Sequence, residues 1–450
     1  MRRWRIFAVL ALTLCGVANG YPIAEERKLG ERFALEAAAT LPLVREPAVL
    51  EYVAGIGRRI VDRLDSPQPF EYRFAVVQDD SMNAFAVPGG FVYLNTGVLL
   101  RTGSESELAG VLGHEIGHSH AHHFVRQQEE GQLLSYAALA GALLSIIHPA
   151  IGAVAAGAEA TAQLKYQRQF EQEADYLAVR YVQAAGYDPH GMTSFMKRLW
   201  NEQRTSPIDQ VPPYLLSHPV TDERISNLEA ATKDVPIDPE SQHPTFGLER
   251  VQAIVRALGA RKTPEQRQPA DVSGRRALAL SGVRLLYGGD PAAAIPVLDE
   301  ARGPGLEEID DDLALAHLRT GDLEGAQRIA RRRLEEAPQD AVARALLGEA
   351  LVASKDYAAA VKELERAARE AAEIDRVEYD LGQAYGRSGS EALGFYHLAR
   401  AFELRGDVRG AIVQYRKAVK ALPAGSDEAV AATRRLELLQ EVARHRIVDR

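Results

Sequence analysis

The chain has almost no cysteine: Cys15 is the only one among 450 residues. No disulfide can therefore form within the chain, and no cluster of thiolates can hold a metal ion. Basic residues are not in excess either, since 53 Lys and Arg stand against 62 Asp and Glu and give a net charge of -9. This balance offers no electrostatic basis for a protein that binds nucleic acid. Any metal site has to be built from histidines and carboxylates.

Long hydrophobic runs are also scarce, and the first of them lies at the N-terminus. Three arginines among the first five residues precede an apolar run from Ile6 to Val17, and Ala18-Asn19-Gly20 follows. This pattern predicts a signal peptide over residues 1–20 that directs export. The run is too short to span a bilayer, which takes roughly 20 residues. The alternative is a lipoprotein signal that is cut before Cys15 and acylated there. In both cases the protein works outside the cytoplasm.

A second apolar stretch covers residues 133–158, in which no Lys, Arg, Asp or Glu occurs. Its length would be enough to cross a bilayer, but Ala and Gly dominate it and His148-Pro149 divides it into two short halves. We expect a helical hairpin that packs on the neighbouring domain. A lid over the active site, or contact with a membrane surface, is the alternative.

The composition predicts a folded chain of several domains. Hydrophobic residues make up 46% of the sequence and charged residues 26%, which excludes collagen-like and wholly disordered chains. At roughly 100 to 200 residues per domain, this length allows about two to four domains. Prolines and polar residues gather after residue 235 and indicate a linker. We expect the signal peptide at 1–20, a first domain at 21–235, the linker at 236–272 and a last domain at 273–450.

The last domain carries a repeated turn signature, in which a residue pair ending in aspartate precedes an alanine-rich segment. The four aspartates are Asp290, Asp322, Asp356 and Asp407. They are spaced by 32, 34 and 51 residues. A period near 34 with paired helices is typical of tetratricopeptide repeats, and the spacing of 51 suggests one inserted helix. Pro338 and Pro423 follow two of the aspartates by sixteen residues, where each would end a helix. An unrelated alanine-rich bundle is the alternative. Repeats of this kind form a groove for a peptide or a partner protein.

The first domain contains the sequence His114-Glu115-Ile116-Gly117-His118 inside a helix predicted over residues 105–128. On a helix of 3.6 residues per turn, His114 and His118 lie on one face and can both bind a zinc ion. Glu115 lies about a quarter turn away, where its carboxylate can act as a general base on water. This arrangement is typical of zinc hydrolases.

A third protein ligand is needed, and the sequence narrows the choice. A metzincin would carry a third histidine at position 124, but that residue is Phe124. A gluzincin takes a glutamate from a later helix, and Glu171 lies in a helix predicted to run to about Ala184. We therefore assign Glu171 to the metal. Asp175, one turn further along, is assigned to the second shell, where it would accept a hydrogen bond from the far nitrogen of His114.

Two strands are predicted before this helix, over Tyr72 to Val77 and over Phe91 to Leu94. Pro88-Gly89-Gly90 precedes the second strand, and a proline next to glycines favours an edge position. An extended substrate could then add to this strand through its main chain. The predicted substrate-binding residues are Gly90, Phe91, Val92 and Tyr93.

Together these motifs resemble the M48-type zinc metallopeptidases. The resemblance is carried by Asn83 to Gly97, the histidine motif at 114–118, Glu171 to Asp175, Leu216-Ser217-His218-Pro219 and Arg224. It implies an α+β, zincin-like (gluzincin) domain with one Zn²⁺ per chain, followed here by an all-α tetratricopeptide-repeat solenoid. Family members with such repeats imply a periplasmic endopeptidase that hydrolyses misfolded or misassembled outer-membrane proteins and assists their assembly. The implied partners are those substrates and, through the repeats, the outer-membrane assembly machinery.

His218 allows two interpretations. It is either a structural histidine that helps to turn the chain before Pro219, or an active-site group that stabilises an oxyanion or binds the metal as an inhibitory fourth ligand. The resemblance favours the active-site role, because family members carry a His-Pro near the metal. An inhibitory His218 would favour the alternative function, a repeat-based chaperone or scaffold with a largely latent peptidase site. A purely structural zinc site is disfavoured, because Glu115 would have no role in it.

Overall fold

The computed structural model describes residues 23–66, 69–130, 168–205, 212–260, 274–371 and 373–448. The predicted signal peptide, the apolar stretch 133–158 and residues 261–272 of the predicted linker lie outside the described residues. In the ranges that are described, none of the helices combines the length and the apolar character that crossing a bilayer requires.

A small mixed sheet forms the centre of the first domain. Its strands are β1 (Arg73–Val77), β2 (Ala84–Val87) and β3 (Phe91–Asn95), in the order β1-β3-β2. β3 runs parallel to β1 and antiparallel to β2. Both predicted strands are present, but the edge position predicted for Phe91 to Leu94 is wrong, because β3 is the central strand. Gly89 and Gly90, with φ of 81° and 87°, form the hairpin turn between β2 and β3 instead, a conformation that glycine adopts without strain.

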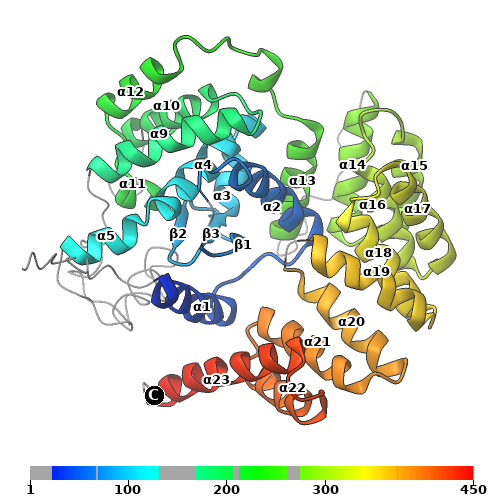
Figure 1. Ribbon diagram of the computed structural model, residues 1–450. Helices are drawn as coiled ribbons and strands as arrows, with labels where there is room; N and C mark the ends of the chain where they lie inside the picture. The colour runs from blue at the N-terminus through cyan, green and yellow to red at the C-terminus, as the bar shows by residue number, and fades with distance from the viewer. Residues whose placement is uncertain are drawn as a thin grey trace, which may run out of the picture.

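The two faces of the sheet pack against different helices (Figure 1). On one face Val76, Val92 and Leu94 join the main core, which includes residues of α2 (Pro47–Val61) and α4 (Glu105–His120). On the other face Phe85 and Tyr93 pack with residues of α1 (Ile23–Thr40) in a second, smaller core. The alternation of faces follows from the two-residue period of a strand. β3 is therefore buried on both sides, and the short helix α3 (Thr96–Arg101) continues directly from it.

Helix α4 carries the histidine motif and is positioned by its glycines. Ser104 caps its N-terminus by accepting a hydrogen bond from the Glu107 N–H. A Cβ placed on Gly113 would lie 2.6 Å from Val182 Cγ2, and one on Gly117 would lie 3.1 Å from the Ala174 carbonyl oxygen. These glycines let α4 approach α9 (Arg168–Ala184) closely, so that the two helices bring their polar side chains together.

The helix predicted over 105–128 is broken in the structure. α4 ends at His120 and α5 (His123–Glu130) begins three residues later. His122, between them, has a φ of 51°, which costs free energy for a residue with a Cβ. Its Nδ1 lies 2.8 Å from Glu26 Oε2 of α1, and this buried partner accounts for the turn that sequence periodicity does not reveal.

The first domain continues with a series of helices around α4 and α9. These are α10 (His190–Thr205), α11 (Pro213–Ser217), α12 (Asp222–Thr232), the 3-10 helix η2 (Glu240–Gln242) and α13 (Phe246–Ala260). α13 packs against both α2 and α14, the first repeat helix. It therefore joins the first domain to the repeats.

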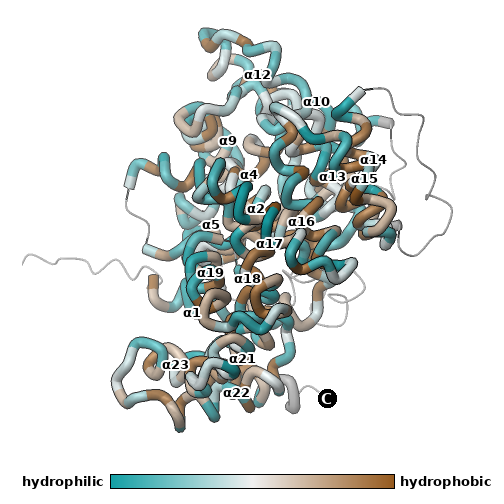
Figure 2. Tube along the Cα trace, turned by 90° about the vertical axis from the view of Figure 1, so that its right-hand side faces the viewer, coloured by the Kyte–Doolittle hydropathy of each residue, from teal (hydrophilic) through white to brown (hydrophobic). Residues whose placement is uncertain are grey.

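The rest of the chain is a stack of antiparallel helices. They are α14 (Arg275–Gly288), α15 (Pro291–Ala301), α16 (Ile309–Thr320), α17 (Leu323–Glu336), α18 (Ala341–Ala353), α19 (Tyr357–Glu370), α20 (Asp375–Arg387), α21 (Glu391–Leu404), α22 (Val408–Ala421) and α23 (Asp427–Val448). Figure 2 shows hydrophobic residues concentrated along α13, α15 and α18, whereas α17 is mostly hydrophilic. Each helix packs mainly on its neighbours in sequence, as in a repeat solenoid.

The repeated aspartates have a shared structural role. Asp290, Asp322, Asp356 and Asp407 are the N-cap residues of α15, α17, α19 and α22, and each accepts a hydrogen bond from the backbone N–H three residues later. Two helices lie between the first and second aspartates and between the second and third, but three lie between the last two. The inserted helix that the spacing of 51 predicted is thus present. α17 and α22 end just before Pro338 and Pro423, as predicted.

The N-terminal helix connects the two ends of the molecule. α1 lies between the sheet and α23 in Figure 1. Glu31 accepts hydrogen bonds from Arg434 at 2.6 Å and Arg435 at 3.1 Å on α23, and Arg32 pairs with Glu441. Leu35 belongs to the core formed by the last repeat helices. α1 therefore packs on the sheet with one side and on the end of the solenoid with the other.

Candidate metal centre

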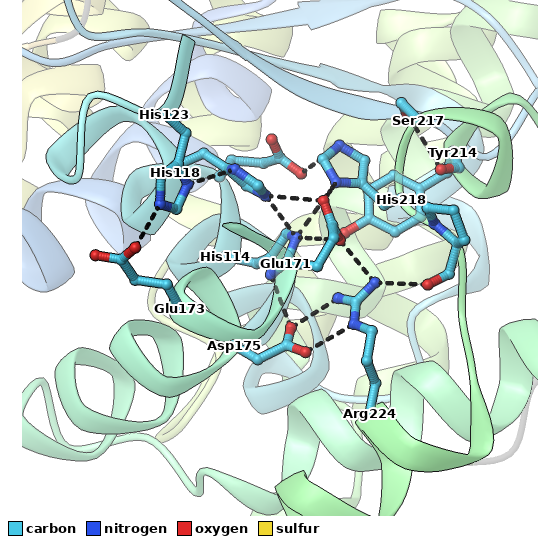
Figure 3. A network of polar contacts seen from close by, with 12 residues as sticks. His114, His118, His123, Glu171, Glu173, Asp175, Tyr214, Ser217, His218 and Arg224 are labelled. Carbon is cyan, nitrogen blue, oxygen red and sulfur yellow. Dashed lines mark hydrogen bonds and ion pairs between the residues drawn. The ribbon is translucent and has the colours of Figure 1, made fainter. Parts of the chain in front are cut away.

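Four side chains converge at the centre of the first domain, as Figure 3 shows. His114 and His118 come from α4, Glu171 from the first turn of α9, and His218 from the residue after α11. One ligand atom from each lies within 4.8 Å of all the others, and all four residues are buried. The structure thus brings together the three predicted ligands, and it adds His218 to the group.

The distances within this group are short. The Nε2 atoms of His114 and His118 lie 3.0 Å apart. Glu171 Oε2 lies 3.5 Å from His114 Nε2, and Glu171 Oε1 lies 3.4 Å from His118 Nε2. His218 Nδ1 lies 3.0 Å from Glu171 Oε1 and 3.4 Å from His114 Nε2. Two imidazoles and a carboxylate that face one point, with a third imidazole beside them, form a donor set that suits a divalent metal ion.

Asp175 lies one turn after Glu171 and faces the other nitrogen of His114. Its Oδ1 lies 2.9 Å from His114 Nδ1. Arg224 of α12 donates to Asp175 twice, from Nε and Nη2, each at 2.7 Å. A third nitrogen of Arg224 lies 2.7 Å from Glu171 Oε2 and donates to the Pro219 carbonyl. Arg224 therefore holds Glu171 and Asp175 of α9 together with the segment that carries His218.

The protonation of these carboxylates follows from their neighbours. Burial raises the pKa of Glu171, but the charges of His218 and Arg224 outweigh it and hold that pKa well below its usual range. Burial likewise raises the pKa of Asp175, and Arg224 reverses the effect. Burial lowers the pKa of His118 well below its usual value. Glu171 and Asp175 are therefore ionised and His118 is neutral at neutral pH, the states in which these groups bind metal.

Glu115 is fully buried beside the four converging side chains. Neither of its carboxylate oxygens makes a hydrogen bond within the described residues, and Oε1 lies 3.7 Å from His218 Nε2. A buried carboxylate without hydrogen bonds costs free energy that a purely structural role would not recover. It marks a position where a polar ligand, such as water or a substrate amide, has a place.

His218 is held in its orientation from several sides. Its backbone N–H donates to the Tyr214 carbonyl at 2.7 Å, and its ring lies over the Tyr214 ring with centroids 4.7 Å apart. The Tyr214 N–H in turn donates to the Met82 carbonyl, two residues before β2. This hydrogen bond joins α11, which precedes His218, directly to the segment that leads into β2. The helical turn of α11 thus presents His218 to Glu115 and Glu171.

The side chain of His118 has a partner in His123, which sequence reasoning allows either as a surface residue or as a residue beside the metal ligands. His123, at the start of α5, is buried, and its Nδ1 lies 2.9 Å from His118 Nδ1. Its Nε2 lies 3.2 Å from Glu173 Oε2, which also accepts from Arg126. Burial lowers the pKa of His123 to about 4, so the ring is neutral at neutral pH. His120 and His122 pair elsewhere, with Asp65 and Glu26.

The predicted substrate-binding residues lie elsewhere than expected. Phe91 and Tyr93 point into the small core under α1, and Val92 points into the main core. Both edges of β3 are occupied by β1 and β2. An added strand could not pair with Gly90 to Tyr93, so this assignment is wrong. Among the described strands, β2 pairs only with β3, so its other edge is not paired with a strand. β2 begins two residues after Met82, whose carbonyl contacts α11.

Comparison with known proteins identifies the first domain. Residues 47–232 match the model of peptidase family M48. These residues form an M48 peptidase domain. A Vibrio cholerae protein is 36% identical over 227 residues, covering 48% of this chain and 46% of its own length. The beta-barrel assembly-enhancing protease of Yersinia pestis is 32% identical over 253 residues, covering 54% and 51%. The Escherichia coli protein of the same name is 30% identical over 214 residues, covering 46% and 43%.

The chain spans about half the length of these relatives. The solved structure of MamA from Desulfovibrio magneticus is 21% identical, with a TM-score of 0.30, and covers 40% of this chain and 98% of its own. The predicted fold class, an α+β M48 domain followed by an all-α tetratricopeptide-repeat solenoid, is confirmed. The domain boundaries 21–235, 236–272 and 273–450 stay predictions.

The M48 family implies a divalent metal ion, and the residues present fit one. The ionised Glu171 and the neutral His118 supply electron pairs, and Asp175 faces Nδ1 of His114, so that Nε2 of His114 is the atom that points toward the other donor atoms. The signals that could have revealed the remaining residues of the site are limited. Arg224 was visible only through the family resemblance, and His123 follows the motif by five residues across a helix break.

Proposed function

We propose that this protein is a periplasmic zinc-dependent endopeptidase. The observation that carries the proposal is the convergence of His114, His118 and Glu171 beside the buried Glu115, whose oxygens lack hydrogen bonds. This combination serves a reaction on a polar ligand. A site that only holds a metal for stability would not need a buried carboxylate with two open acceptors.

Zinc is the metal that the donor set favours, with one ion per chain. Two imidazole nitrogens and one carboxylate oxygen are the protein ligands of many catalytic zinc sites. When bound, zinc supplies Lewis-acid chemistry, because it polarises oxygen atoms and lowers the pKa of water. His114, His118 and Glu171 are the proposed ligands. Asp175, held by Arg224, is proposed to keep the proton of His114 on Nδ1.

Glu115 is proposed as the general base. Its carboxylate can accept a proton from water that attacks a peptide carbonyl, and can then return the proton to the leaving amine. Because the site is buried, the carboxylate does not compete with bulk water for this proton. The edge of β2, rather than β3, is proposed to pair with the main chain of an extended substrate. Such pairing reads the backbone and so tolerates many sequences.

The position of His218 supports two opposite roles, one that inhibits cleavage and one that assists it. Its Nδ1 lies among the donor atoms, which favours a fourth ligand that holds the enzyme inactive, while Nε2 faces Glu115. If His218 turned away from Glu171, the same ring could stabilise an oxyanion. Replacing His218 by alanine separates these roles, since it raises cleavage in the first case and lowers it in the second.

The biological setting is proposed from the relatives. Proteins named beta-barrel assembly-enhancing protease match about half of this chain, and the predicted signal peptide would direct export. We propose misfolded or misassembled outer-membrane proteins as the substrates. The repeat solenoid would dock these substrates or the outer-membrane assembly machinery.

A second function is supported by the position of His218. If that residue keeps the site latent, the protein would act mainly as a repeat-based chaperone or scaffold of envelope assembly. Prevention of aggregation of an unfolded outer-membrane protein that survives Glu115→Gln would support this function. Loss of that effect together with cleavage would oppose it.

The decisive experiment measures cleavage of an unfolded protein by the mature chain and by Glu115→Gln, with zinc content determined for both. Glu223→Gln, on the exposed surface of α12, is the matched control. The proposal expects the parent and the control to cut, and Glu115→Gln to retain zinc without cutting. Equal cleavage by Glu115→Gln and the parent would refute the role of Glu115 and with it the proposed reaction.

A further inference from the structure

His123 occupies a position next to the metal ligands that a packing role alone does not explain. Its ring is fully buried and stacks on Phe170, with centroids 4.6 Å apart and an angle of 18°. An apolar side chain would fill such a place at lower cost, because a buried imidazole needs hydrogen-bond partners. The two nitrogens of His123 face His118 and Glu173, and this places the ring between a proposed metal ligand and a carboxylate.

The hydrogen-bond directions in this chain of groups are fixed by chemistry. His118 has its Nε2 3.0 Å from His114 Nε2, so Nε2 is the atom that faces the metal position. In a neutral ring that binds through Nε2, the proton is on Nδ1. His118 Nδ1 must then donate to His123 Nδ1, which lies 2.9 Å away. His123 is left with its own proton on Nε2, and it donates that proton to Glu173 Oε2 at 3.2 Å.

The outer end of this chain is anchored by charge. Glu173 accepts a hydrogen bond from Arg126 Nη1 at 2.9 Å, and Arg126 also lies over the ring of Phe170. The Glu173 side chain is 42% exposed, so its ionisation costs little. Glu173 lies between Glu171 and Asp175 in the sequence, but it points away from the metal position and pairs with His123 and Arg126 instead.

The backbone places His123 at this point through the break between α4 and α5. His122, with its φ of 51°, turns the chain so that His123 folds back under His118. If α4 continued without a break, His123 would lie on a different face of the helix from His118, because the two residues are five positions apart. Strained backbone beside a functional site is often retained for such a reason. Here the pair of His122 with Glu26 of α1 holds the turn.

We propose that His123, supported by Glu173, is a positioning residue that fixes the tautomer and the orientation of the metal ligand His118. It serves His118 as Asp175 serves His114, so that each histidine of the motif has its own partner. The inference rests on the proposed function, in that His118 binds zinc. Outer partners of this kind typically change metal affinity by about 10- to 100-fold when they are removed.

The first test compares zinc affinities of three variants of the full mature chain by competition with a chelator. His123→Asn keeps an acceptor where His123 Nδ1 was, whereas His123→Gln and His123→Leu remove it. We expect the dissociation constant for zinc to rise about 10- to 100-fold in the Gln and Leu variants and only a few-fold in the Asn variant. His120→Leu, which changes the last histidine of α4, whose partner is Asp65, is the matched control and should keep the parent affinity. Parent affinity in the Leu variant would overturn the proposal.

The second test reads the tautomers directly. In nitrogen-15 histidine spectra of the zinc-loaded Glu115→Gln chain, we expect the proton of His123 on Nε2 and that of His118 on Nδ1. A proton on Nδ1 of His123 would overturn the proposal, because His123 would then have no acceptor to offer. This spectrum also covers the case in which a His123 variant does not fold.

Neither test depends on peptide cleavage. A parent chain that binds zinc but does not cut would contradict the proposed function, and the inference would still be decided by affinity and tautomer. A parent that binds no zinc would overturn both. Glu173→Ala, at a half-exposed position, should weaken zinc binding less than His123→Leu with little change in thermal stability, and an unchanged affinity would remove Glu173 from the proposal.

Discussion

Glu46 is an acidic residue placed where ionisation is costly, at the joint between the M48 domain and the repeats. It precedes α2, and its carboxylate accepts from the Tyr287 hydroxyl at 3.3 Å and lies 3.8 Å from Arg319. Asp312 lies nearby and is bonded twice by Arg250 of α13. Burial, aided by the charge of Asp312, outweighs Arg319, Tyr287 and Arg250 and raises the pKa of Glu46 to about 7.

The magnitude of the effect follows from linkage. A pKa of about 7 against the ordinary 4.5 corresponds to about 3 kcal/mol, at about 1.4 kcal/mol per pH unit. Between these values the folded state binds the proton and the unfolded state releases it. The free energy of unfolding therefore falls as pH rises through this window. Below it both states are protonated, and above it the full penalty is present. Glu46→Gln, which carries no charge at any pH, lacks this penalty.

The assay is urea-induced unfolding of the parent and Glu46→Gln at pH 5, 6, 7 and 8, followed by circular dichroism. We expect similar stability at pH 5 and an advantage for Glu46→Gln at pH 8 of up to about 3 kcal/mol. Glu51→Gln, within α2 and paired with Arg58, controls for the loss of one negative charge. If Glu46→Gln is less stable than the parent at pH 8, Glu46 is ionised and its pair with Arg319 outweighs burial, which refutes the reasoning.

Three further predictions concern the site and the repeats. Arg224→Met should lower the free energy of unfolding by about 3 to 5 kcal/mol, because it leaves Asp175 and Glu171 buried without their cation. Calorimetry measures this loss. Arg198→Met is the comparison and should lower stability less, because its partner Glu107 also accepts a hydrogen bond from Ser194. Lys355→Gly should raise stability by up to about 1 kcal/mol, because Lys355 has a φ of 66° where the other three turns have glycine; an unchanged or lower urea midpoint would contradict this. Removal of zinc by a chelator should lower the melting temperature of the parent but not that of His114→Ala, and equal lowering in both would show that the metal binds elsewhere.

The sequence predicted those parts of the site that depend on local spacing. His114, Glu115 and His118 share one helix, and Glu171 and Asp175 share another, so the 3.6-residue period already determines which side chains point the same way. The repeats were visible because their turns also depend on local contacts: each capping aspartate accepts a hydrogen bond from a backbone N–H only three residues later.

Features that depend on long-range pairing could not be predicted. The position of β3 in the sheet depends on its pairing with β1, and the Pro-Gly-Gly signal of an edge strand is also the signal of a tight turn. The role of His123 depends on a left-handed residue, His122, whose partner Glu26 is almost 100 residues away in sequence. Periodicity alone favoured an unbroken helix there.

The position of α1 has a consequence for the order in which the chain can fold. α1 is the first described helix to leave the ribosome, yet its Glu31 and Arg32 pair with α23, the last. Gly406, in the turn before α22, lies so close to α1 that a Cβ on it would be 2.2 Å from the Ala38 carbonyl oxygen. These contacts cannot form before synthesis is nearly complete, and contacts between residues so distant in sequence form slowly. The face of α1 that contacts α23 therefore stays uncovered until the last repeat helix has been made.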